Sequence, residues 1–100
     1  MRLITWRHLA DFAAAHPEAA PSLNRWRDLI RDGDWRTPAE LTASFSGAKT
    51  VSADRVRFEV AGGAYRLIAA FDFGRQIAFV KFLGAHAEYD RIDAATVALF

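Results

Sequence analysis

The sequence predicts an α+β fold in which helices come first and a small, twisted, antiparallel-rich sheet follows. Apolar residues recur with a helical period of about 3.6 residues before Gly47 and with a period of 2 after it. The pair Gly62–Gly63 separates two alternating runs, as in a β-hairpin whose turn residues both need a positive φ. For 100 residues, 52% of them hydrophobic, we expect a single domain over residues 1–100 with the helices packed on one face of the sheet.

Three helices are expected in the first half of the chain, after a short strand at "RLIT". The first runs from Thr5 to Pro17. The second starts at Pro21, which suits a first helical turn, and stops at Gly33. The sequence "TPAE" at 37–40 is a capping box and predicts the start of a short third helix. The residues expected to face the sheet are Trp6, Leu9, Phe12, Ala13, Leu23, Trp26, Leu29, Ile30, Leu41 and Phe45.

Three strands are expected in the second half, joined by tight turns at Gly62–Gly63 and Gly74–Arg75. The three are "RVRFEV" at 55–60, "YRLIAAFDF" at 65–73 and "QIAFVKFLGA" at 76–85. Turn geometry sets strand register, so each turn predicts a set of cross-strand partners. The pairs predicted by the first turn are Ala61–Ala64, Val60–Tyr65, Glu59–Arg66, Phe58–Leu67 and Arg57–Ile68. Those predicted by the second are Phe73–Gln76, Ala69–Val80, Ile68–Lys81, Leu67–Phe82 and Arg66–Leu83.

These registers divide the strand residues between two faces of the sheet. The face expected to receive the helices is almost wholly apolar and comprises Val56, Phe58, Val60, Tyr65, Leu67, Ala69, Val80 and Phe82. The opposite face comprises Arg55, Arg57, Glu59, Arg66, Ile68 and Lys81. It is either the ordinary solvated face of a half-buried sheet or a basic surface that binds a phosphate-rich ligand.

Charge and composition narrow the class of protein. The formal net charge is only +1, but the basic residues Lys49, Arg55, Arg57, Arg66, Arg75 and Lys81 outnumber the acidic Asp54, Glu59 and Asp72 in the middle of the chain. The absence of cysteine excludes disulfides and thiolate zinc sites and favours a reducing compartment. No long apolar run marks a signal peptide or a membrane span, so we expect a cytoplasmic protein.

Polar residues cluster where the last strand ends, in "LGAHAEYDRID". This segment is either a strand-to-helix cap or a site for proton transfer, which the pKa of a histidine such as His86 would suit. If the chain turns helically there, Tyr89 lies on the same side as His86. Asp90 would orient a ring nitrogen or cap the turn, and Glu88 would face solvent. His86, Glu88 and Asp90 would make a poor metal site, because no second histidine is near them. The sequence contains no cofactor-binding motif.

These residues resemble a known family. The strand and turn with Phe58, Val60, Gly62 and Gly63, the following "YRLI" at 65–68, and the later "HAEYD" at 86–90 are similar to the HigB-type toxins of the RelE/ParE superfamily. The similarity spans nearly the whole chain. It departs at Gly63, where asparagine is usual, and at Ala85, where threonine is usual.

The resemblance implies a RelE-like fold and the toxin of a type II toxin–antitoxin system, which would cleave translated mRNA on the ribosome by metal-independent attack of the 2′-hydroxyl. A HigA-type helix-turn-helix antitoxin would neutralise it, and operator DNA would be contacted only through that antitoxin. The catalytic residues would be Arg66, His86, Tyr89 and Lys81, and the further RNA contacts Arg55, Arg57 and Lys49. No metal and no cofactor would be needed.

Two alternatives remain open at this point. The same fold occurs in ParE-like toxins that inhibit a target stoichiometrically and need no proton-transfer residue. A degenerate toxin that acts only as antitoxin partner and corepressor would also fit the modest net charge and Ala85.

Overall fold

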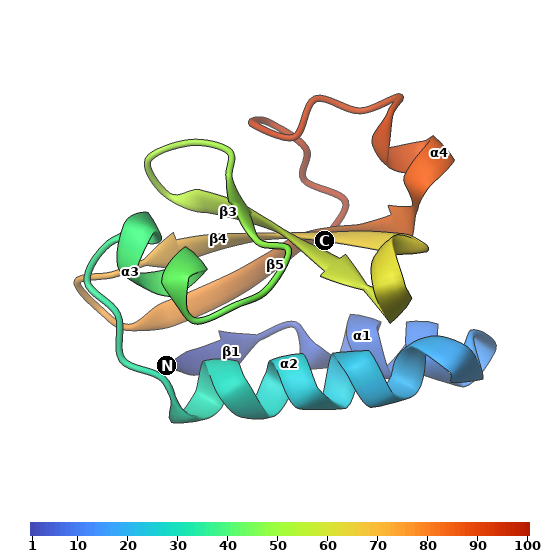
Figure 1. Ribbon diagram of the computed structural model, residues 1–100, viewed down its shortest axis with the longest axis horizontal. Coiled ribbons are helices and arrows are strands. Elements are labelled where there is room, and N and C mark those ends of the chain that lie inside the picture. The colour runs from blue at the N-terminus through green and yellow to red at the C-terminus, as the bar shows by residue number, and fades with distance from the viewer.

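The computed structural model describes residues 1–100 and has the predicted α+β architecture (Figure 1). A single five-stranded sheet has the strand order β1-β5-β4-β3-β2. The elements are β1 (Arg2–Ile4), α1 (Trp6–Ala15), the 3-10 turn η1 (Pro17–Ala19), α2 (Ala20–Asp32), α3 (Pro38–Ala43), β2 (Lys49–Thr50), β3 (Arg55–Val60), the 3-10 turn η2 (Ala61–Gly63), β4 (Tyr65–Asp72), β5 (Ile77–Ala85) and α4 (His86–Tyr89).

The sheet is mixed, because β1 pairs in parallel with β5 while all other neighbours are antiparallel. Helices α1 and α2 lie on one side of the strands, and α4 and the C-terminal segment lie on the opposite side (Figure 1). We call these the helical face and the outer face. The layering buries the apolar strand face that the sequence predicts.

The helix boundaries follow local signals in the sequence. Pro21 lies in the first turn of α2, where its missing N–H costs nothing, and Gly33 follows the last turn. A Cβ at Gly33 would lie 1.9 Å from the Trp35 ring, so any larger residue there would displace that ring. The Thr37 side chain accepts a hydrogen bond from the Glu40 N–H at 3.2 Å, which confirms the predicted cap of α3.

The first hairpin has the predicted register but a larger turn. Val60 lies opposite Tyr65, and every predicted partner up to Arg57–Ile68 is confirmed. Ala61 and Ala64 are not a ladder pair, because η2 and Ala64 form a four-residue connection. Gly62 and Gly63 have φ values of 67° and 97°, as the hairpin prediction required, and Ala61 shares this left-handed conformation.

The second hairpin contains the main error in the sequence prediction. The ladder closes at Asp72–Ile77, and Ala69 lies opposite Val80 as expected. A bulge then shifts the register between Ile68 and Ala69, because β5 contains one extra residue there. The predicted partners of Ile68, Leu67 and Arg66 are therefore wrong; the true pairs are Ile68–Phe82, Leu67–Leu83 and Arg66–Gly84.

The bulge exchanges the faces of two large side chains. Leu83 joins the core under the helices, whereas Phe82 turns to the outer face. A one-residue insertion reverses every later side chain in a strand, since side chains alternate with a period of 2. The alternation of apolar and polar residues in the sequence does not reveal this inserted residue, which is why the prediction missed it.

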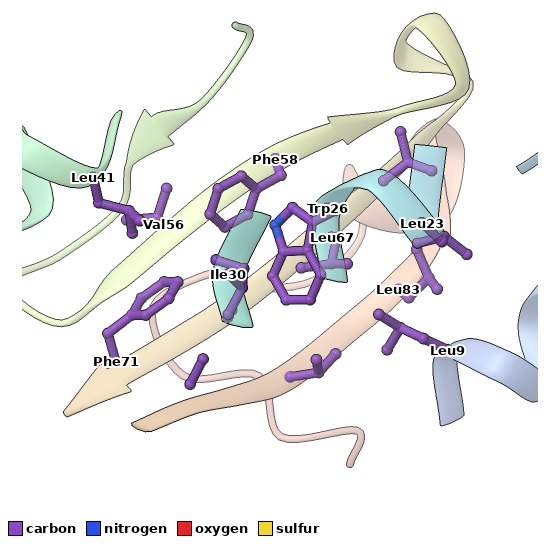
Figure 2. Close-up of a cluster of buried hydrophobic side chains, with 14 of the residues drawn as sticks. Leu9, Leu23, Trp26, Ile30, Leu41, Val56, Phe58, Leu67, Phe71 and Leu83 are labelled. Atoms are coloured by element: carbon purple, nitrogen blue, oxygen red, sulfur yellow. The ribbon is translucent and has the colours of Figure 1, made fainter. Parts of the chain in front are cut away.

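The core lies between α1, α2 and the helical face of the sheet (Figure 2). Leu9, Leu23, Ile30 and Leu67 are fully buried in it. Besides Phe82, one further residue predicted to lie in the core does not: Leu29 is 38% exposed, because the buried face of α2 follows the spacing Leu23, Trp26, Ile30. No helix has the length and apolar character that a membrane span requires.

Phe58 occupies the centre of this core, 2% exposed, with its ring 5.5 Å from the Trp26 ring and 5.0 Å from the Phe45 ring. We expect Phe58→Ala to lower the free energy of unfolding by about 3–5 kcal/mol, because it removes buried aromatic area and leaves a cavity. Urea denaturation followed by circular dichroism measures this. Leu99→Ala, at a side chain 61% exposed, is the matched control and should change stability by less than about 0.5 kcal/mol.

Candidate functional site

Three charged side chains meet on the outer face where β3 and β4 run side by side. The Glu59 carboxylate lies 3.6 Å from Arg66 Nη1 and 3.8 Å from Arg57 Nη2. The cross-strand contact of Glu59 with Arg66 confirms the pairing predicted from the first hairpin. The two guanidinium groups are mostly covered, with side-chain exposures of 11% for Arg66 and 18% for Arg57.

Arg66 also contacts His86, twenty residues away in sequence. Arg66 Nη2 lies 3.3 Å from His86 Nδ1, and Nη1 donates to the Gly63 carbonyl at 3.0 Å. Because a guanidinium only donates, Nδ1 must be the acceptor, and the ring proton is then on Nε2. His86 Nε2 lies 3.3 Å from the Asp90 carboxylate, so the imidazole is held between a cation and an anion.

Two backbone contacts bring His86 to Arg66. Tyr65 is paired with Ala85, which puts the residue before Arg66 beside the residue before His86. The His86 N–H donates to the Ala64 carbonyl at 3.3 Å. The Glu88 carboxylate accepts a hydrogen bond from the Ala85 N–H at 3.3 Å at the start of α4. Within this helical turn His86 and Asp90, four residues apart, lie on the same side.

Tyr89 lies on α4, as a helical turn after His86 predicted, but its ring contacts the sheet. Its ring centroid is 6.4 Å from that of Phe82, in an edge-on arrangement. This contact exists because the bulge in β5 turns Phe82 to the outer face. Tyr89 is half-buried, whereas the His86 side chain beside it is 56% exposed.

The other predicted cations are spread out. Lys81 lies at the bulge with Nζ 5.6 Å from the Phe79 ring centroid, so the predicted row of Arg57, Ile68 and Lys81 is wrong, and Phe82 takes the third position. Lys49 is exposed on β2, opposite Arg57.

A C-terminal segment covers part of the outer face, which the sequence prediction treated as open. Arg55 Nη1 donates to the carbonyls of Ala94 and Val97 at 3.2 and 2.7 Å. The Leu99 N–H donates to the Lys81 carbonyl at 2.9 Å, and Ile68 on this face is fully buried. The accessible part of the face is therefore the end where His86 and Glu59 lie.

Most of the chain matches a known protein family. Residues 19–92 match the model of HigB_toxin, described as the RelE-like toxic component of a toxin–antitoxin system. The chain belongs to the HigB toxin family. A similar curated protein is the mRNA interferase HigB of Escherichia coli O6:H1, which is 28% identical over 94 residues, covering 92% of this chain and 91% of that protein.

The matched range contains the candidate site but not the C-terminal segment. All seven predicted site residues, from Lys49 to Tyr89, lie within the matched residues 19–92. The segment from Asp93 to Phe100, which Arg55 holds on the outer face, lies beyond that match. Helices on one face of an open, mixed five-stranded sheet are the RelE-like architecture that the resemblance implied.

A second polar cluster joins the helical layer to the strand that bears Arg66. The Tyr65 hydroxyl donates to the Glu18 carboxylate and lies 3.3 Å from His16 Nδ1. The hydrogen bond from Tyr65 is the main cause that lowers the pKa of Glu18 below its usual 4.5, and the same bond raises the pKa of Tyr65. Sequence reasoning missed this cluster, because Glu18 and Tyr65 are remote in the chain.

This hydrogen bond predicts a pH dependence of stability. A lowered carboxyl pKa stabilises the fold above pH 4.5, and that contribution is lost as pH falls through the folded pKa. The raised pKa of Tyr65 gives stability below pH 10 that is lost as pH rises through its folded value. We therefore expect Glu18→Gln to lower the melting temperature near neutral pH and to approach the wild-type value in strong acid.

Thermal unfolding followed by circular dichroism at a series of pH values measures this difference. Asp11→Asn, a carboxyl exposed on α1, is the matched control and should follow the wild-type curve throughout. A Glu18→Gln melting temperature that differs from wild type by the same amount at every pH would contradict the assignment.

Proposed function

We propose that this chain is a ribosome-dependent mRNA interferase that cleaves translated mRNA through the substrate's own 2′-hydroxyl. The observation that carries the proposal is the contact of Arg66 with His86 on a face where Arg57 is also near. A cation for the phosphate and a group for proton transfer are what such cleavage requires. The similarity to a curated protein named mRNA interferase supports the same reaction.

In this reaction the 2′-oxygen bonds to phosphorus and the bond to the 5′-oxygen breaks, leaving a 2′,3′-cyclic phosphate and a 5′-hydroxyl. A phosphate bound by Arg66 would draw Nη2 away from His86 and leave Nδ1 free to accept the 2′-hydroxyl proton. Asp90 would then stabilise the imidazolium through Nε2–H. The same imidazolium can return the proton to the departing 5′-oxygen.

Arg66 is suited to the phosphorane because a guanidinium stays charged and donates two parallel hydrogen bonds. Its buried Nε and that of Arg57 have no acceptor in the free protein. These Nε atoms are enclosed, so a bound phosphate would pair with the Nη atoms of the two groups. Arg57 is thus the second phosphate contact in our proposal, and Lys49 on the neighbouring strand is a contact further along the RNA.

The remaining predicted residues receive more distant roles. Tyr89 would stack on a base or protonate the leaving oxygen after a change in its contact with Phe82. Lys81 adds positive potential near the bulge. Arg55 would contribute mainly by holding the C-terminal segment in place, and less by contacting RNA.

The partner in this proposal is a HigA-type helix-turn-helix antitoxin that neutralises the toxin and carries the complex to operator DNA. No membrane and no cofactor enter the mechanism. A small gene for such a protein beside the gene for this chain is the simplest observation in favour of this partner.

Primer extension on a reporter transcript in a reconstituted translation system tests the reaction. Cuts should fall within translated codons, leave 5′-hydroxyl ends, and vanish when the nucleotide 5′ to the cut carries a 2′-deoxyribose. Cuts that leave 5′-phosphate ends, or that persist with the deoxy substitution, would exclude 2′-hydroxyl attack. Cleavage of the same RNA without ribosomes would exclude ribosome dependence.

A further inference from the structure

A groove of about 190 Å³ opens on the helical side of β3 and takes no part in the proposed chemistry. It lies between α2, the segment that follows α3, and the edge of β3. The lining residues are Ser22, Arg25, Trp26, Leu29, Ser44, Phe45, Ser46, Phe58 and Glu59. Figure 2 shows the labelled side chains of Trp26 and Phe58 side by side at the top of the core.

The groove adjoins a length of strand edge without a neighbouring strand. β2 pairs only with Val56 and Arg57, so the sheet has no partner for β3 at Glu59 and Val60. Gly47, in the segment that leads into β2, lies against the Glu59 side chain on this edge, so an occupant would insert a side chain into the groove and would not add a strand to the sheet.

Two apolar side chains line the groove and its rim. Trp26 is 5% exposed, and its indole Nε1–H has no acceptor in the free protein. The Nε1 atom is enclosed, so an occupant of the groove meets the ring of Trp26 and not its N–H. Leu29, one of two large apolar side chains exposed on the molecule, lies at the rim.

The charge on the rim selects the kind of occupant. Arg25 is exposed and makes no ion pair, so it can bind a carboxylate, whereas Glu59 is already engaged by Arg57 and Arg66. One free cation beside a carboxylate is too little positive charge for an RNA strand. A peptide segment with an apolar side chain and a neighbouring acidic residue fits the groove better.

We propose that an acidic–apolar segment of the antitoxin binds in this groove, with its apolar side chain against Trp26 and Leu29 and its carboxylate on Arg25. This inference rests on the proposed partnership with an antitoxin but not on RNA cleavage. Glu59 borders both the groove and the candidate site, but Arg25 and Leu29 make no contact with Arg66 or His86. Variants of the groove should therefore cut mRNA normally and escape neutralisation.

Binding is measured on full-length Arg66→Ala protein, which makes the result independent of nuclease activity. The probe is the purified protein encoded beside the toxin gene, titrated by calorimetry. Leu29→Asp and Arg25→Glu should each weaken its Kd at least tenfold. The matched controls are Leu99→Asp and Arg31→Glu, an exposed leucine and an exposed α2 arginine outside the groove, and both should bind like the parent protein.

A second measurement needs no groove variant. In ¹⁵N–¹H spectra the Trp26 indole signal should shift when the antitoxin binds, because an apolar side chain packs against its ring, while the Trp6 indole signal stays in place. Unchanged Kd values for both groove variants, or an unmoved Trp26 signal in the saturated complex, would overturn the proposal. So would a single-stranded RNA that moves the Trp26 signal and loses affinity in Arg25→Glu.

Discussion

Arg66→Ala is expected to reduce mRNA cleavage on the ribosome by about 10²–10³-fold, the usual loss when one donor to a developing anionic transition state is removed. Arg66 is the side chain that contacts both Glu59 and His86, through Nη1 and Nη2 respectively. Single-turnover primer extension measures the loss, and growth after induced expression reports it in cells.

Two further variants separate this role from a general effect on charge or folding. Arg66→Lys keeps the positive charge but loses the two parallel N–H donors of the guanidinium, so its cleavage rate should lie between those of wild type and Arg66→Ala. Arg75→Ala removes an arginine whose side chain is 80% exposed at the far turn and should cleave like wild type. A well-folded Arg66→Ala protein with full activity would exclude Arg66 from the site.

His86→Gln is expected to lower cleavage by about 10²–10⁴-fold, the range for loss of a general acid–base group. The glutamine carbonyl can still accept the hydrogen bond from Arg66, so the site keeps its shape while proton transfer is lost. Cleavage and growth arrest should fall together in this variant, and circular dichroism should show an unchanged fold.

The same variant distinguishes the proposed enzyme from its alternatives. A ParE-like stoichiometric inhibitor needs no proton transfer, so His86→Gln would then arrest growth as strongly as wild type. For a degenerate toxin, neither the wild-type protein nor the His86→Gln variant would arrest growth. Asp90→Asn, which keeps a hydrogen-bond acceptor near His86 Nε2 without the charge, should cause a smaller loss than His86→Gln.

Much of the candidate site could be predicted from alternation and one hairpin. Two glycines with positive φ define the turn after β3, and the register from Val60–Tyr65 to Arg57–Ile68 follows from it. Because local turn geometry determines that register, Glu59 and Arg66 could be paired without any tertiary information. The capping box at Thr37 and the helical turn after His86 are local in the same sense.

The bulge in β5 could not be predicted, because an inserted residue changes the pairing without changing the apolar pattern. Phe82 and Leu83 are both large and apolar, so each suits either face of the sheet. Burial under α1 and α2 favours Leu83 in the core, and Phe82 then lies outward against Tyr89. That choice depends on the packing of the whole helical layer.

The sequence by itself determined the α+β class, the helical and outer faces of β3 and β4, and the identity of the charged residues, since these depend on periodicity and turn chemistry. Only the tertiary structure decided how much of the basic face is accessible, because Arg55 and Lys81 hold the C-terminal segment over it through contacts between remote parts of the chain. The contact of Arg66 with His86 and the groove beside Trp26 have the same origin: each forms where separate elements meet.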